Sequence, residues 1–252
     1  TNTGSKLHEV YLPHMHSAQS QMPYSGVFPN VSRHDSVCAV CFEPHPINAR
    51  KADRYIRKMR LKRAILLPAA ISSTNGVAIF HDDNDTKANF WGSSLLMWKP
   101  GMASYASYEV PTVSLAWLLR QHFIGPGASP AVVAKMDIEG EEFTTVPSAI
   151  EELCQAVDVL QLERHDRFFS GRFQGRNRRP KMSNNNRTAQ LNGALAIMAR
   201  RQACSSAEAS PPKRHPPGPT QCRTLVFELH RYEQIQMGPT VRSGNCSVNK
   251  IE

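Results

Sequence analysis

The segment Val132–Phe143, VVAKMDIEGEEF, passes from an apolar run to four acidic residues within six positions. An apolar run of this kind is typical of a buried parallel strand, and acidic residues are favoured in the first turn of a following helix. The same pattern also suits a carboxylate delivered to the carboxyl edge of an open α/β sheet, where ligands bind. The segment alone leaves both interpretations open: a solvated helix start and a binding site.

The rest of the chain alternates apolar runs with amphipathic helical patterns, which is typical of a parallel α/β sheet. Strands are predicted over residues 36–44, 63–71, 77–81, 131–137, 156–163 and 222–232, with an extended piece over 107–113. Helices are predicted over residues 47–59, 147–155 and 190–201, and from about Ser114 onward. The sequence therefore predicts an α/β fold whose strands are spread along most of the chain.

Composition excludes a membrane-spanning helix within the chain, because mean hydropathy is −0.41 and no apolar run approaches the required length. The net charge of +9 is concentrated in two segments, Arg50–Arg63 and Arg164–Arg187, each with eight basic residues and one acid. The first is interpreted as the solvated face of a helix. Within the second, Arg172–Lys181 is either a solvated insertion or a surface for an anionic partner such as RNA.

Cysteine usage indicates structural residues rather than a metal or disulfide scaffold. The chain has six cysteines, which are too few and too scattered for a disulfide framework at this length. Cys38 and Cys41 form a CAVC motif, but it lies in a predicted strand, where positions three apart point to opposite faces. There is no second CxxC motif in the sequence. We therefore predict no metal site.

Five segments in order carry a family resemblance: CFEPHP, LLPAAISSTNG, VPTVSLAWLL, AKMDIEGEEF and VLQLERH. Together they resemble the FkbM family of S-adenosylmethionine-dependent methyltransferases, over roughly residues 36 to 165. The most specific part of the match is MDIEGEE, whereas FEP alone would be weak. The resemblance implies a Rossmann-like class I methyltransferase sheet, mostly parallel, with an antiparallel last strand.

The same resemblance implies S-adenosylmethionine as cofactor and assigns residues to it. Glu43, at the end of the second strand of that fold, is expected to accept hydrogen bonds from the ribose hydroxyls. Ala69 and Ala70 are expected to leave room for the adenine. Asn2 and Gly4, in TNTGSK, are expected to belong to the glycine-bearing loop whose backbone approaches the methionine end of the cofactor.

Two residues are candidates for the chemistry of methyl transfer to a hydroxyl, where a base helps to remove the proton. Asp137, at the edge of the fourth strand, is the first candidate, and His165 is the second. The alternatives are that Asp137 orients the cofactor or caps a helix and that His165 is a surface residue. Glu139, Glu141 and Glu142 are expected to serve the helix that follows the strand.

The start of the chain departs from the family pattern. The first strand and its leading glycine are absent, and 39 positions separate Gly4 from Glu43, where such folds usually place the acid about 20 residues on. We therefore expect an insertion at about residues 11–33 and a chain that is a fragment of a longer protein. The predicted organisation is a cofactor-binding core over 1–165, a basic loop, helix and Pro-rich linker over 166–220, and a strand region over 221–252 that completes the sheet.

Three functions remain in competition from sequence. The first is a methyltransferase acting on a hydroxyl of a small molecule or glycan. The second is a nicotinamide-dependent Rossmann oxidoreductase, with Glu43 again on a ribose, although MDIEGEE argues against it. The third is a basic module without activity that binds RNA or another polyanion through Arg172–Lys181.

Overall fold

The computed structural model describes residues 38–61, 63–83, 90, 92–97, 105–125, 132–166, 184–207 and 225–229. The chain divides into two compact units. The first unit comprises Thr1–Ser114, Ile138–Glu141 and His165–Pro180, and the second comprises Leu115–Asp137, Glu142–Arg164 and Lys181–Glu252.

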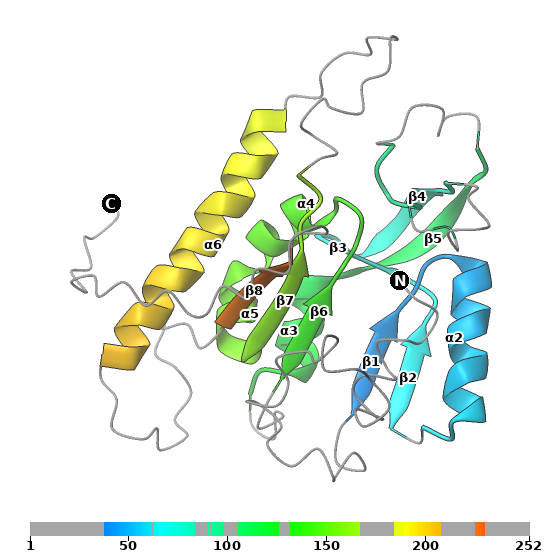
Figure 1. Ribbon diagram of the computed structural model, residues 1–252, viewed down its shortest axis with the longest axis horizontal. Coiled ribbons are helices and arrows are strands. Elements are labelled where there is room, and N and C mark those ends of the chain that lie inside the picture. The colour runs from blue at the N-terminus through cyan, green and yellow to red at the C-terminus, as the bar shows by residue number, and fades with distance from the viewer. Residues whose placement is uncertain are drawn as a thin grey trace. The chain divides into compact units, whose positions relative to one another are not determined.

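The first unit begins with a β–α–β arrangement of β1 (Ala39–Phe42), α2 (Pro46–Lys58) and β2 (Ala64–Leu67). β1 and β2 pair in parallel, and α2 lies beside them (Figure 1). Helix α2 begins at Pro46 because the side chain of His45 accepts the N–H of Asn48, and proline is tolerated in the first turn.

A second sheet of the first unit contains β3 (Ala70–Ser72), β4 (Gly76–His81) and β5 (Ser107–Ser114), in the order β3-β5-β4. β3 is parallel to β5, and β4 is antiparallel to it. Gly76 opens β4 with φ +147°, which favours glycine. Phe80 and Val110 pack with Ala70 in a small core.

The strand predicted over residues 63–71 is two strands. The first part is β2 and the second is β3, and the two belong to different sheets. Pro68 lies between them, and proline cannot donate the ladder hydrogen bond that would continue a strand. The predicted strand at 77–81 and the extended piece before Ser114 are confirmed as β4 and β5.

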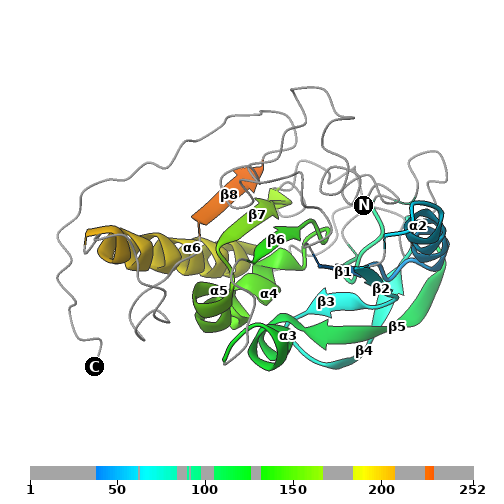
Figure 2. The same ribbon diagram turned by 90° about the horizontal axis from the view of Figure 1, so that it is seen from below.

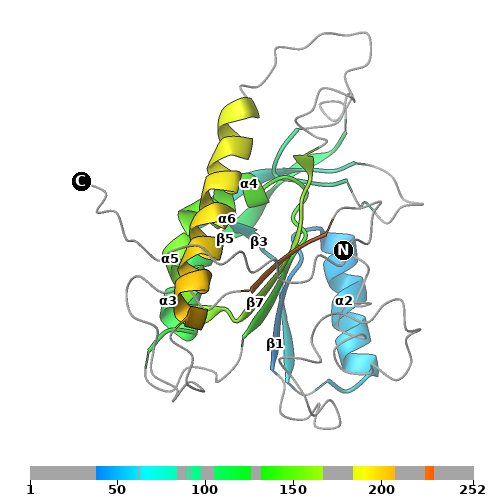
Figure 3. The ribbon, with the colours of Figure 1, turned by 60° about the vertical axis from the view of Figure 1, so that its left-hand side comes forward.

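The second unit is built on a three-stranded sheet of β6 (Val133–Met136), β7 (Val159–Glu163) and β8 (Leu225–Leu229). Its helices are α3 (Leu115–His122), α4 (Glu142–Ser148), α5 (Ile150–Ala156) and α6 (Asn184–Ala207). Figures 2 and 3 show α4, α5 and α6 on one face of this sheet. The core of the unit includes Phe143, Leu153, Leu160, Leu191 and Met198, all fully buried.

The mixed α/β class is confirmed, and β8, the last strand within the described residues, is parallel rather than antiparallel, so the expected antiparallel last strand is not found among them. β8 pairs with β7 in parallel, with Val159 opposite Leu225. The chain between the two strands includes the long helix α6, and a helical crossover of this kind returns the chain to run in the same direction. Among the described strands, the antiparallel one is β4.

Two helix predictions are also corrected. The predicted helix at 147–155 is two short helices, α4 and α5, with Pro147 inside α4. α6 extends beyond the predicted 190–201 at both ends, so the loop expected up to residue 188 ends earlier. No helix within the described ranges is long and apolar enough to cross a membrane.

Candidate functional site

In the first unit, three of the residues predicted to bind the cofactor, Glu43, Ala69 and Ala70, lie at one edge of a parallel strand pair. Phe42 pairs with Leu67, and the N–H of the next residue, Glu43, donates to the Leu67 carbonyl at 3.2 Å. Ala69 and Ala70, which follow β2, are both buried. Glu43 and the two alanines therefore leave their strands at the same carboxyl edge, where α/β sheets bind ligands.

Glu43 is buried, with only 9% of the residue exposed, and its side chain is held in a defined orientation. Its Oε1 accepts the backbone N–H of His45 at 3.0 Å. A carboxylate at this depth needs hydrogen-bond donors to offset its desolvation. The arrangement suits an acid that is set in place before a ligand arrives.

Tyr108, on β5, lies in the field of the same carboxylate. Burial is the largest effect that raises the pKa of its phenol above the usual range, and the negative charges of Asp82 and Glu43 raise it further. The phenol therefore stays protonated at neutral pH and remains a hydrogen-bond donor beside these acids.

Within the acidic segment that follows β6, Ile138–Glu141 forms a strained loop that belongs to the first unit. Glu139 has φ +51° and Gly140 has φ +101°, and a left-handed non-glycine residue is uncommon. The Ser94 hydroxyl donates to the Glu139 carbonyl at 2.7 Å. The Ser72 hydroxyl donates to Oε1 of Glu141 at 3.0 Å. Contacts from β3 and from the 92–97 segment therefore hold the loop in this conformation.

His165, the second candidate base, lies against this loop. Its Nε2 is 3.4 Å from Oε2 of Glu139, and the side chains are 1% and 10% exposed. The alternative that His165 is a surface residue is therefore wrong. A buried carboxylate beside an imidazole orients the ring and stabilises its protonated form.

The expected role of the acids after Asp137 needs correction. Glu142 does lie in the first turn of α4, as predicted, but it is buried rather than solvated. Glu139 and Glu141 precede the helix and are engaged by His165 and Ser72. Gly140 between them was the sequence signal for a turn, since glycine accepts positive φ without strain.

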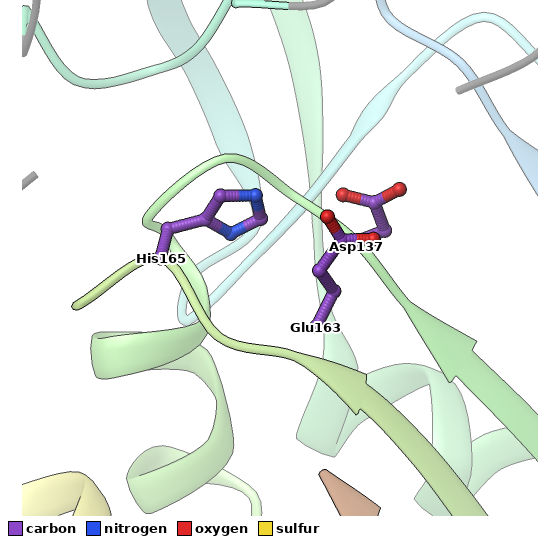
Figure 4. Close-up of side chains that lie close together, drawn as sticks. All are labelled: Asp137, Glu163 and His165. Atoms are coloured by element: carbon purple, nitrogen blue, oxygen red, sulfur yellow. The ribbon is translucent and has the colours of Figure 1, made fainter. Parts of the chain in front are cut away.

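In the second unit, Asp137 follows β6 and Glu163 ends β7. The two strands are parallel, with Met136 opposite Leu162, so both carboxylates leave the sheet at its carboxyl edge (Figure 4). Lys135 Nζ lies 3.2 Å from Oδ2 of Asp137 and 3.6 Å from Oε2 of Glu163. The partly buried Lys135 ammonium therefore forms ion pairs with both carboxylates.

Sequence reasoning missed His45, Asp82 and Lys135 as site residues. For Lys135 the signal was present, because a charged residue inside the apolar run AVVAKMD needs a partner when the strand is buried. For Asp82 there was no such signal, since its contact with His45 spans 37 positions.

Four further predictions concern segments outside the described residues. They are Asn2, Gly4, the insertion at 11–33 and the anionic surface at Arg172–Lys181.

Comparison of the chain with models of protein families, with curated proteins and with solved structures finds no match.

Proposed function

We propose that the protein is an S-adenosylmethionine-dependent methyltransferase, similar to the FkbM family, that methylates a hydroxyl of a small molecule or glycan. The observation that carries the proposal is the common edge of β1 and β2. There a buried acid, Glu43, follows one strand and two small buried residues, Ala69 and Ala70, follow the next. Such an edge is suited to a nucleoside, with the acid on the ribose and the small residues beside the base.

The residues present fit the cofactor in chemistry. Glu43 offers a charged acceptor of the kind that binds ribose hydroxyls strongly. Ala69 and Ala70 carry no side chain beyond Cβ, so a flat base can approach the backbone. The phenol of Tyr108, held protonated near Glu43, adds a donor to the same region.

The chemistry then requires an acceptor hydroxyl to lose its proton as it is methylated. When bound, the cofactor supplies a methyl group already activated by a sulfonium. We assign proton removal to His165, because buried Glu139 stabilises the imidazolium that the ring would form. The Asp137 carboxylate pairs with Lys135. We therefore assign Asp137 the alternative role given in the sequence analysis, that of orienting the cofactor.

Calorimetric titration tests the proposal. We expect S-adenosylhomocysteine to bind the wild-type chain. Glu43→Ala should weaken that binding by roughly 10- to 150-fold, the equivalent of losing about 1.5–3 kcal/mol of hydrogen bonding to a charged group. Asp53→Ala is the matched control, because Asp53 is an exposed acid on α2 paired with Arg57, and it should leave the affinity unchanged.

The same titrations separate the competing functions. Tight binding of a nicotinamide dinucleotide with no binding of S-adenosylhomocysteine would overturn the proposal in favour of an oxidoreductase. If neither cofactor binds and RNA binds with a steep salt dependence, the basic module is the better description. Equal affinity of wild type and Glu43→Ala for S-adenosylhomocysteine would remove Glu43 from the site.

A further inference from the structure

We propose that His45 and Asp82 are positioning residues for Glu43, so that the acid assigned to the ribose is held in place from the end of β4. The inference rests on the proposed function and adds to it two residues that do not themselves contact the cofactor. It follows from an unbroken series of contacts inside the first unit.

The series starts at the carboxylate. Oε1 of Glu43 accepts the backbone N–H of His45 at 3.0 Å. The direction of that N–H depends on the backbone of His45, which is extended, with φ −71° and ψ 119°. Anything that fixes the backbone of His45 therefore fixes one oxygen of Glu43.

The imidazole of His45 fixes that backbone through both ring nitrogens. Nδ1 lies 3.4 Å from the N–H of Asn48 and must accept from it. Because Nδ1 is the acceptor, Nε2 carries the hydrogen, and it donates to Oδ2 of Asp82 at 3.3 Å. The contacts thus select one tautomer of a ring that is 2% exposed.

Aromatic packing prevents the ring from turning away. His45 stacks on Phe90, with ring centroids 4.2 Å apart and planes 21° from parallel. Tyr108 approaches the ring edge-on at 6.3 Å. The imidazole therefore has one accessible orientation, and that orientation points Nε2 at Asp82.

Asp82 is itself anchored. It follows β4, and its N–H donates to the Ala106 carbonyl at 2.9 Å. Its Oδ1 also accepts the Ser93 hydroxyl at 3.4 Å. The position of Glu43 at the β1 edge is therefore coupled, through His45, to the β4 end of the neighbouring sheet.

A histidine that only caps α2 would have the same contact with Asn48. What distinguishes the proposal is energetic coupling between Asp82 and Glu43, which a cap does not require. A double-mutant cycle measures that coupling directly, because it compares the effect of Asp82→Ala with and without the Glu43 carboxylate.

The affinity for S-adenosylhomocysteine is measured for wild type, Asp82→Ala, Glu43→Ala and the double variant. We expect Asp82→Ala to weaken binding by about 10-fold in wild type and by less than about 2-fold in Glu43→Ala. Asp82→Asn keeps an acceptor for Nε2 and should recover most of the loss. Asp53→Ala again serves as the control acid. Equal losses in both backgrounds, in variants whose folding is verified by thermal melting, would overturn the proposal.

A second measurement needs no cofactor. Nitrogen-15 NMR of the His45 ring should show hydrogen on Nε2 and not on Nδ1 in the wild type. Hydrogen on Nδ1 would overturn the positioning series whatever the ligand. If the wild type binds no S-adenosylhomocysteine, the proposed function fails. If it binds but Asp82 and Glu43 are uncoupled, only the positioning role fails.

Discussion

His165 and Glu139 form a buried pair, with Nε2 of the histidine 3.4 Å from Oε2 of the glutamate. The pair depends on a backbone conformation that most residues avoid, because Glu139 has φ +51°. Strain of this kind persists only where surrounding contacts enforce it, and it is concentrated at functional sites. The pair and its loop therefore give the sharpest tests of the proposed chemistry.

Replacing Glu139 by glutamine should reduce methyl transfer more than cofactor binding. The substitution keeps the size of the side chain but removes the negative charge that lies 3.4 Å from the His165 ring. We expect turnover to fall by roughly 10- to 100-fold, a fraction of what a positioned base contributes, while S-adenosylhomocysteine affinity changes little. Steady-state turnover and calorimetry on the same preparation check this.

The matched control is Glu141→Gln, because Glu141 is a buried acid of the same loop that accepts from Ser72. It should affect stability but spare turnover in the folded protein. If both variants lose turnover equally, Glu139 acts on the shape of the loop rather than on His165.

Gly140→Ala should destabilise the protein. At φ +101°, a Cβ is strained whatever the surrounding space, and we expect a loss of about 1–3 kcal/mol in the free energy of unfolding. Gly193→Ala is the control, because Gly193 lies inside α6 with no atom within 4 Å of the added Cβ. It should stabilise by about 0.5–1 kcal/mol. Urea unfolding measures both, and a neutral Gly140→Ala would refute the strained loop.

Lys135→Met should cost more stability than Asp137→Asn. Removing the cation leaves Asp137 and Glu163 at adjacent strand ends without the charge that bridges them, and we expect a loss of about 1–3 kcal/mol. Asp137→Asn leaves Lys135 with Glu163, so the fold should survive while turnover falls. Because repulsion between partly exposed charges is screened, high salt should recover part of the Lys135→Met loss. No difference between the variants would contradict the shared-cation arrangement.

Deprotonation of the partly buried Cys41 thiol should lower the free energy of unfolding at alkaline pH. Burial raises its pKa to about 11, above the usual value near 9. The unfolded thiol therefore loses its proton first, so the stabilisation is complete below about pH 9 and is lost as pH rises through about 11. The expected contribution is about 2–3 kcal/mol, because each unit of pKa difference is equivalent to about 1.4 kcal/mol.

The difference in urea midpoint between wild type and Cys41→Ala isolates this effect, since other alkaline titrations are common to both. That difference should shift against the wild type between about pH 9 and 11. Cys38, which is exposed, should be alkylated faster than Cys41 at pH 8 when labelling is resolved by peptide mass spectrometry. Equal labelling rates would contradict burial of Cys41.

The sequence by itself was sufficient for what depends on neighbouring residues. Apolar runs predicted β1, β6 and β7, because a parallel strand covered on both faces reads as an unbroken apolar segment, and a shorter apolar run predicted β4, which is antiparallel. The ends of two of these runs also located Glu43 and Asp137 at strand edges, since an acid can follow a buried strand only where the strand emerges. Pro68 and Gly140 were visible as local signals for a break and a turn, although neither the break nor the turn was predicted.

Only the tertiary structure decided what depends on residues distant in sequence. The parallel pairing of β8 with β7, the contact of His45 with Asp82 and the placement of His165 against Glu139 join segments that no local pattern relates. Burial decided the remaining roles, because Glu139, Glu141 and Glu142 have similar sequence surroundings but different partners once folded. Propensity and periodicity are properties of short segments, whereas hydrogen-bond partners are selected when the chain packs. The strand edges were therefore predictable, and the groups that position Glu43 and His165 were not.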